Sequence, residues 1–220
     1  HYCSRRQRQM CIRDSLTVND STGKVAPELA KKVGEAKASE KFHESGATHE
    51  FWVYITDDAD SGRRVIYQKK ASSQNMAVTI YSERFQRDIS VPPDGVAEAV
   101  YDISFHISSD NFKGIKHTVQ NITTNAWHHV AFVYERARTE QVLAYIDGKY
   151  HSKTTGVRAE LDNIILGDGV ITVGSGTNHT SYADSTTPTL QKFKGLLDEF
   201  RVWNCIRSAS SIESYMHKNI

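Results

Sequence analysis

Short runs of aromatic and β-branched residues, separated by turn-forming residues, dominate the chain from about residue 50 onward. Such runs favour strands, because these side chains pack well on a pleated, half-buried surface. The segments between them are too short for helical crossovers, which parallel neighbours need, so we expect antiparallel sheets. The sequence predicts an all-β fold of two stacked sheets. The expected strands are 50–56, 64–69, 76–81, 100–107, 115–119, 127–134, 142–146 with a return strand from 149, 170–173 and 196–203.

Four local patterns refine this prediction. Segment 127–134 is apolar on both faces, as expected of a central strand that is covered on both sides. Asp147 and Gly148 predict a tight hairpin turn, and Gly195 predicts a close backbone approach before the last strand. The end of the chain, 208–216, predicts a short capped helix with an apolar face. That face would hold Ile212, Tyr215 and Met216.

Charge and hydropathy argue against two broad classes of protein, those that bind nucleic acid and those that span a membrane. The chain has 220 residues, with 27 Lys and Arg against 26 Asp and Glu, for a net charge of +1. A nucleic-acid-binding protein would normally carry a strong basic excess, so no nucleic-acid partner is expected. The longest apolar runs, 51–55 and 130–134, have five residues each. A membrane-spanning helix needs about 20, so no membrane span is expected.

The first 15 residues differ from the rest of the chain. Segment 4–15 resembles translated sequencing-adaptor sequence of the kind found at the ends of metagenomic reading frames, and the alternative is a natural basic arm. We leave 1–15 out of the fold prediction, which makes Cys205 a lone, buried thiol. Residues 16–44 form an uncertain lead-in, with a short strand at 16–18 and a helix over 27–41 that opens at Pro27. The β-sandwich then occupies 45–220.

Four stretches in order carry a resemblance to a known family. The stretches are Phe51-Trp-Val53 with Val65-Ile-Tyr-Gln-Lys69, Asn125-Ala-Trp-His-His-Val-Ala-Phe-Val-Tyr134, Leu143-Ala-Tyr-Ile-Asp-Gly-Lys149, and Phe193-Lys-Gly-Leu-Leu-Asp-Glu-Phe-Arg-Val-Trp-Asn204 followed by Arg207-Ser-Ala209. Together they resemble the laminin-G-like, pentraxin-related jelly-roll domain of the concanavalin A-like lectin/glucanase superfamily, over about 45–218. The resemblance implies an antiparallel jelly-roll β-sandwich. The family usually opens with a Phe-Asp-Gly-like strand, whereas this chain has the Lys/Ala/Glu-rich stretch 27–41 there.

The resemblance also implies a function. It points to a non-catalytic recognition or adhesion module, extracellular or on a cell or virion surface, that binds a glycan or a protein and belongs to a longer chain. Sugars are recognised by exposed aromatic rings beside amide and carboxylate groups, and long loops often carry such sites. The loop 174–192 offers this combination, with a tyrosine on the return strand nearby. The ligand-binding candidates are Asn178, His179, Tyr182, Asp184 and Tyr150.

Calcium is the cofactor that the resemblance implies, because related domains often bind it at a loop rim through carboxylate, amide and carbonyl oxygens. The acidic loop 57–60 and the loop that begins at 168 could supply such ligands. The candidates are Asp58, Asp60 and Asp168. The adjacent His128 and His129 should point to opposite faces of a strand and therefore should not share one metal ion.

Two other functions stay open as alternatives. A glycoside hydrolase of the same superfold would need two carboxylates about 5–10 Å apart across a cleft. Asp198 and Glu199 come nearest to the glucanase pattern, but adjacent strand residues point to opposite faces. The chain also lacks the Gly-x-Ser-x-Gly and His-Glu-x-x-His patterns, so we expect no catalytic residues. The second alternative is a structural spacer without a ligand.

Overall fold

The structure, a computed structural model, describes residues 10–11, 16–18, 46–57, 62–70, 77–87, 98–108, 114–135, 141–155, 170–176, 190–203 and 205–218. These residues form strands and one short helix. The elements are β1 Met10–Cys11, β2 Leu16–Val18, β3 Gly46–Ile55, β4 Arg63–Lys70, β5 Ala77–Arg87, β6 Glu98–Ser108, β7 Gly114–Thr123, β8 Trp127–Glu135, β9 Gln141–Ile146, β10 Lys149–Thr155, β11 Val170–Val173, β12 Leu190–Lys192, β13 Gly195–Trp203 and α2 Ala209–Tyr215.

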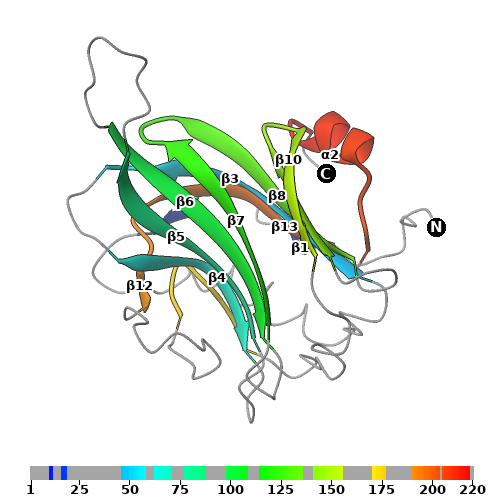
Figure 1. The fold of residues 1–220 in the computed structure, drawn as a ribbon, viewed down its shortest axis with the longest axis horizontal. Coiled ribbons are helices and arrows are strands. Elements are labelled where there is room, and N and C mark those ends of the chain that lie inside the picture. The colour runs from blue at the N-terminus through cyan, green and yellow to red at the C-terminus, as the bar shows by residue number, and fades with distance from the viewer. Residues whose placement is uncertain are drawn as a thin grey trace.

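The strands form two stacked sheets (Figure 1). The seven-stranded sheet has the order β1-β13-β3-β8-β9-β10, with β2 also paired to β13, and the six-stranded sheet has the order β11-β4-β5-β6-β7, with β12 paired to β4. The pairings are antiparallel apart from the short one between β12 and β4, where Leu190 lies opposite Arg63 in parallel register. The predicted antiparallel jelly-roll sandwich is confirmed, with this one local exception.

The core lies between the sheets and follows the period of two along each strand. On β8, Val130, Phe132 and Tyr134 face the other sheet, and the ring of Phe132 stacks on Phe105 of β6 at 5.4 Å. The alternate residue Ala131 lies on the outward face. Outward-facing apolar side chains form a second, smaller cluster, which contains Ala131, Val133, Tyr145 and Ile212. The predicted two-sided burial of this strand is therefore confirmed.

Glycines occupy two positions that few other residues tolerate. The β9–β10 turn has Asp147 at φ 50° and Gly148 at φ 77°, as the predicted hairpin requires. At the start of β13, Gly195 has φ 147°, and a Cβ there would lie 2.3 Å from the carbonyl oxygen of Tyr54. The close approach predicted for Gly195 is confirmed.

Helix α2 begins after Ser208, whose side chain accepts a hydrogen bond from the backbone N–H of Ser211 at 3.2 Å. Ile212 is fully buried against the outward face of the seven-stranded sheet. The helix also covers the β9–β10 turn, because a Cβ on Gly148 would meet Met216. The capped helix predicted here is confirmed. Among the described residues, no helix is long or apolar enough to cross a membrane.

The N-terminal part departs from the prediction in two respects. Residues 10–11, which we left out of the fold, pair with β13 as strand β1, next to the predicted strand β2. The expectation of a lone Cys205 thiol is wrong, because Cys205 is disulfide-bonded in the structure. That expectation depended on leaving out Cys3 and Cys11 with segment 1–15. The expected helix over 27–41 lies outside the described residues, and the adaptor interpretation stays a prediction.

Candidate functional site

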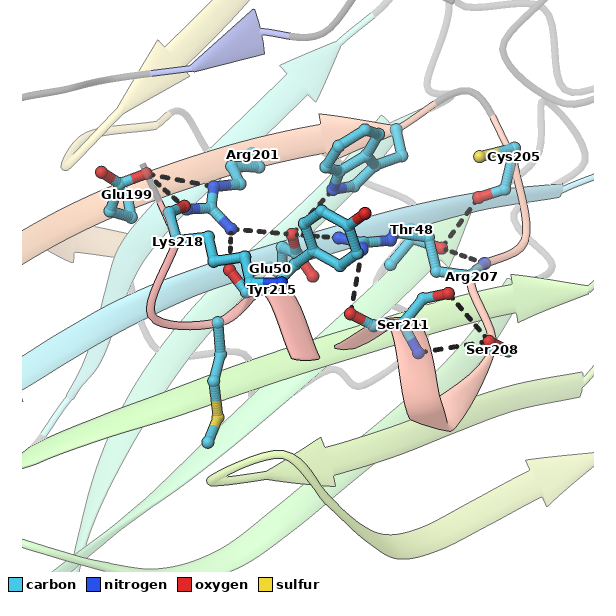
Figure 2. A network of polar contacts seen from close by, with 12 residues as sticks. Thr48, Glu50, Glu199, Arg201, Cys205, Arg207, Ser208, Ser211, Tyr215 and Lys218 are labelled. Atoms are coloured by element: carbon cyan, nitrogen blue, oxygen red, sulfur yellow. Dashed lines mark hydrogen bonds and ion pairs between the residues drawn. The ribbon is translucent and has the colours of Figure 1, made fainter. Parts of the chain in front are cut away.

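A buried network of charged side chains holds the C-terminal segment, residues 205–218, on the outward face of the seven-stranded sheet (Figure 2). At its centre is Glu50 of β3, which is fully buried. One of its oxygens, Oε1, lies 2.7 Å from Nη1 of Arg207 and 3.4 Å from Nη1 of Arg201. The same oxygen accepts a hydrogen bond from the indole N–H of Trp203 at 2.8 Å. A buried carboxylate is tolerated here because two cations and an N–H donor compensate it.

The cations in turn hold the C-terminal segment through its carbonyl groups. Arg201 donates to the carbonyl oxygens of Tyr215 and Lys218 at 2.9 and 2.7 Å, and Arg207 donates to that of Ser211 at 3.0 Å. The indole of Trp52 donates to the carbonyl of Met216 at 2.9 Å. Tyr215 is the last residue of α2, where helix carbonyls carry partial negative charge, so a cationic donor suits its carbonyl oxygen. The network is thus structural, and it positions α2.

Of the two carboxylates considered for sugar hydrolysis, Glu199 belongs to this structural network. Asp198 accepts from the backbone N–H of Glu199, which has φ 47° at an irregularity of β13. Glu199 Oε2 lies 2.6 Å from Nη2 of Arg201, whose guanidinium also contacts Glu50. Arg201 therefore contacts both Glu50 and Glu199 beneath the C-terminal segment. A hydrolase needs two carboxylates on either side of an open sugar site. Asp198 and Glu199 do not form such a pair.

Three large hydrophobic side chains among the described residues are exposed, and all three are aromatic: Trp127, Tyr150 and Tyr215. Trp127 shares a face of β8 with the outward-facing Ala131. Tyr150 is the Cα partner of Tyr145, which packs in the outward cluster with Ile212. Tyr215 belongs to α2, which covers that cluster. We call these three residues the outer aromatic face, because they lie on the outward side of one sheet.

The three rings differ in what already touches them. Trp127 lies tilted against Tyr54, with ring centroids 5.7 Å apart. Tyr150 meets Tyr145 edge to face at 5.9 Å. The ring of Tyr215 lies near two cations, Arg207 at 5.2 Å and Lys218 at 4.7 Å. Tyr150 is the most exposed of the three, at 54%, and Trp127 and Tyr215 are exposed to a similar extent, at 39% and 41%.

Polar groups are fixed by hydrogen bonds at the end of β8 where Trp127 begins the strand. Asp147 Oδ1 accepts from the backbone N–H of His129 at 2.9 Å, and Asp147 Oδ2 lies 3.2 Å from His128 Nδ1. The other ring nitrogen of His128 lies 2.8 Å from Thr123 Oγ1. Asp147 and Thr123 are exposed. Two hydrogen bonds thus hold the exposed Asp147 carboxylate in place at this end of β8.

The outward face of the six-stranded sheet is polar but covered. Tyr81 is fully buried, with the cations of Arg63 and Lys116 at 5.2 and 5.7 Å from its ring centre. Ser104 and Thr118 form a hydrogen-bonded pair across β6 and β7 at 2.9 Å. Tyr81 has no accessible surface, so this described ring is not open to stacking.

Most of the predicted site residues lie outside the described residues. This holds for the ligand-binding candidates Asn178, His179, Tyr182 and Asp184, and for the calcium candidates Asp58, Asp60 and Asp168. The remaining candidate, Tyr150, is 54% exposed on the outer aromatic face. Its place next to the 174–192 loop stays a prediction.

Two buried histidines show how strongly this sheet excludes water. Burial lowers the pKa of His49, in the core, to about 3. Burial, followed by the nearby Arg201, lowers the pKa of His129, beneath α2, to about 3 as well. The predicted divergence of His128 and His129 is visible in their partners, since the first contacts Asp147 and the second packs on Trp52.

Within the described ranges, no group of three metal-ligating side chains gathers.

Sequence reasoning missed Trp127 as a candidate and Glu50 as a structural centre. Both lie in segments that we assigned to strands for their apolar character. The signal for Glu50 was a carboxylate inside an otherwise apolar strand, which needs a cationic partner. The signal for Trp127 was its position as the first residue of a strand, where one side of the ring can stay open to solvent.

The fold and the buried network together define a jelly-roll β-sandwich with a C-terminal helix fastened to one face. Residues 32–213 match the family described as the concanavalin A-like lectin/glucanases superfamily, in its Laminin_G_3 branch. The chain therefore belongs to this family, as the sequence motifs predicted. No curated protein sequence matches the chain.

Several solved structures have a similar fold. The botulinum neurotoxin serotype D binding domain matches with a TM-score of 0.53 and 13% identity, over 80% of this chain and 38% of that one. The receptor-binding domain of the botulinum neurotoxin C/D mosaic serotype matches with a TM-score of 0.51 and 14% identity, over 77% and 35%. The binding domain of Paraclostridial Mosquitocidal Protein 1 matches with a TM-score of 0.50 and 17% identity, over 80% and 39%. This chain thus spans about two fifths of these structures or less, and the likeness concerns the fold alone.

Proposed function

We propose that this chain is a non-catalytic recognition module that binds carbohydrate or protein through the outer aromatic face. The supporting observation is that Trp127, Tyr150 and Tyr215, the exposed large hydrophobic side chains of the described residues, all lie on one side of the sandwich. Exposed aromatic rings are the groups by which proteins stack on sugars and anchor protein partners. Family membership is consistent with this role, since the family includes lectins.

The proposal places the module outside a cell, on a cell surface or on a virion, as one part of a longer chain. Two observations support this. Cys205 is disulfide-bonded, and disulfides persist in oxidising compartments. The similar solved structures are binding domains. Calcium at Asp58, Asp60 and Asp168 remains part of the proposal. Hard oxygen ligands of this kind suit that ion.

A glycan array probed with the full chain tests this proposal. The array is run once in calcium and once in EDTA, and specific binding to any glycan supports a lectin-like module. The matched variant carries Trp127→Ala, Tyr150→Ala and Tyr215→Ala, and loss of its signal assigns binding to the outer aromatic face. Loss of signal in EDTA supports a calcium site. A blank array from folded protein argues against carbohydrate and leaves protein adhesion or a spacer role.

Glycoside hydrolysis remains the alternative function, because the superfamily also includes glucanases. Release of reducing ends from a panel of polysaccharides measures it directly. Because Glu50 and Glu199 both contact Arg201, we expect no release. Release that disappears in Glu199→Gln would overturn the non-catalytic proposal.

A further inference from the structure

The two sheets meet at one edge through a serine and a histidine. Among the described strands, β10 ends the seven-stranded sheet and β7 ends the six-stranded sheet. Ser152 of β10 is the Cα partner of the core residue Ala144. His117 of β7 is the Cα partner of the core residue Phe105. Directly paired residues share a face of their sheet, so Ser152 and His117 both face inward. Nε2 of His117 lies 3.0 Å from Oγ of Ser152.

A β-bulge brings a second imidazole to the same hydroxyl. The register between β9 and β10 shifts between Tyr150 and Ser152, so His151 is the extra residue of the bulge. Neighbouring residues of a regular strand point to opposite faces, whereas a bulge re-aims a side chain, often beside a functional site. Here Nδ1 of His151 lies 2.7 Å from Oγ of Ser152. Two ring nitrogens, one from each sheet, therefore converge on one point.

Two convergent imidazole nitrogens suit a transition-metal ion. Neutral imidazole is a preferred ligand of Cu²⁺, Zn²⁺ and Ni²⁺. Bonds from zinc to imidazole nitrogen are about 2.0–2.1 Å long, so an ion in the place of the hydroxyl needs each nitrogen to move by about 1 Å or less. His151 is exposed and Ser152 is half-buried, so an ion can enter from solvent. A serine nucleophile needs instead a single base that a third group orients.

We propose that Nε2 of His117 and Nδ1 of His151 bind a divalent transition-metal ion at this edge of the sandwich. The ion joins β7 of one sheet to β10 of the other. Closed structural zinc sites have four protein ligands, so water completes the coordination here and the ion exchanges with solvent. Imidazole ligands distinguish this site from the proposed calcium site, whose ligands are oxygens. The inference goes beyond the proposed recognition function and does not depend on it.

Calorimetric titration of the full chain with Cu²⁺, in the presence of glycine as a competing chelator, tests the proposal. The chain has ten histidines, so the site is defined as the binding that a double variant, His117→Gln with His151→Gln, lacks. Electron paramagnetic resonance at one equivalent of Cu²⁺ should show coupling to two imidazole nitrogens, a signature that a merely structural role of these rings does not produce.

Single variants separate the ligands from their neighbours. His117→Gln and His151→Gln should each raise the dissociation constant for Cu²⁺ about a hundredfold, because the second contact of a chelate is intramolecular. Ser152→Ala keeps both rings and should change the constant by no more than about tenfold, the effect of one hydrogen bond. His217→Gln, at an exposed position of the C-terminal segment, is the matched control and should leave the constant within about twofold.

The choice of ion gives a second, independent measurement. Zn²⁺ and Ni²⁺ should bind more weakly than Cu²⁺, and Ca²⁺ should not displace Cu²⁺, because nitrogen ligands follow the Irving–Williams order and hard cations prefer oxygen. Zn²⁺ should also raise the unfolding temperature of the parent chain but not that of the double variant, since an ion that binds the folded state stabilises it.

Three results would overturn the site. They are equal Cu²⁺ binding by the parent chain and the double variant, displacement of Cu²⁺ by Ca²⁺, and loss of binding in Ser152→Ala while His151→Gln still binds. None of them affects the proposed recognition function, which the glycan array tests separately. Thermal unfolding of each variant without metal shows that a loss of binding does not come from a loss of fold.

Discussion

Among single residues, Glu50 determines whether the C-terminal segment is held on the sandwich. Its Oε1 atom is shared by Arg207, Trp203 and Arg201 at 2.7, 2.8 and 3.4 Å. Removing one partner of a buried ion pair is costly because the remaining charge stays buried. We expect Glu50→Gln to lower the free energy of unfolding by about 3–5 kcal/mol, measured by urea denaturation.

The control for Glu50 is Glu213, an exposed glutamate on α2. Glu213→Gln should change the free energy of unfolding by no more than about 0.5 kcal/mol, as is usual for exposed positions. Equal effects of the two substitutions would contradict a structural role for the buried network. Arg207→Lys is informative as well, because a lysine cannot reproduce the forked contacts to Glu50 and to the Ser211 carbonyl.

Among the elements, β13 depends on a glycine at its first residue. Gly195 has φ 147°, and a Cβ would lie 2.3 Å from a backbone oxygen of β3, which cannot move without breaking the β3–β13 pairing. We expect Gly195→Ala to destabilise the fold by about 1–3 kcal/mol, the usual cost of such strain. Gly176→Ala is the comparison, since its nearest neighbours are side-chain atoms at 3.0 Å. A smaller effect at Gly195 than at Gly176 would refute this account.

Helix α2 has only seven residues, so its ends matter. Its first turn contains no acidic residue, and Ser208 caps the Ser211 N–H. Ser208→Ala should lower the free energy of unfolding by about 1 kcal/mol. Ser208→Asp should preserve or raise it, because a carboxylate both caps the helix and complements its dipole. Thermal unfolding of the two variants side by side measures this, and a stabilising Ser208→Ala would contradict it.

The strands and the turns could be predicted from sequence, whereas the links between distant elements could not. Alternating side chains and the Asp147–Gly148 turn are local patterns that determine local structure. The short parallel partner strand β12 has no comparable local pattern, and its pairing with β4 depends on a connection of more than 100 residues. Glu50 and Arg207 are separated by 157 residues. Only the folded sheet brings them together.

At the scale of the whole molecule, the seven-stranded sheet buries an ionisable ring on each of its faces. His49 lies in the core against Tyr67 and Phe105 at 5.3 Å, and His129 lies outward against Trp52 at 5.4 Å. Burial lowers both pKa values from 6.5 to about 3. Between these values the unfolded chain binds a proton at each site and the folded chain does not. Stability is therefore highest above pH 6.5 and falls as the pH decreases toward 3.

This linkage predicts the acid sensitivity of the protein. Each histidine contributes a slope of about 1.4 kcal/mol per pH unit, or about 2.7 for both, in the lower part of that window. Urea denaturation at intervals from pH 5 to 7.5 measures the slope while most carboxylates stay ionised. His129→Gln should remove the contribution of His129, about 1.4 kcal/mol per pH unit, and leave the contributions of His49 and of His117, whose pKa burial also lowers. His151→Gln, at an exposed position on β10, should leave the slope unchanged. A slope that is the same in all three proteins would mean that His129 is accessible to protons in the folded state, and that the C-terminal segment does not seal this face.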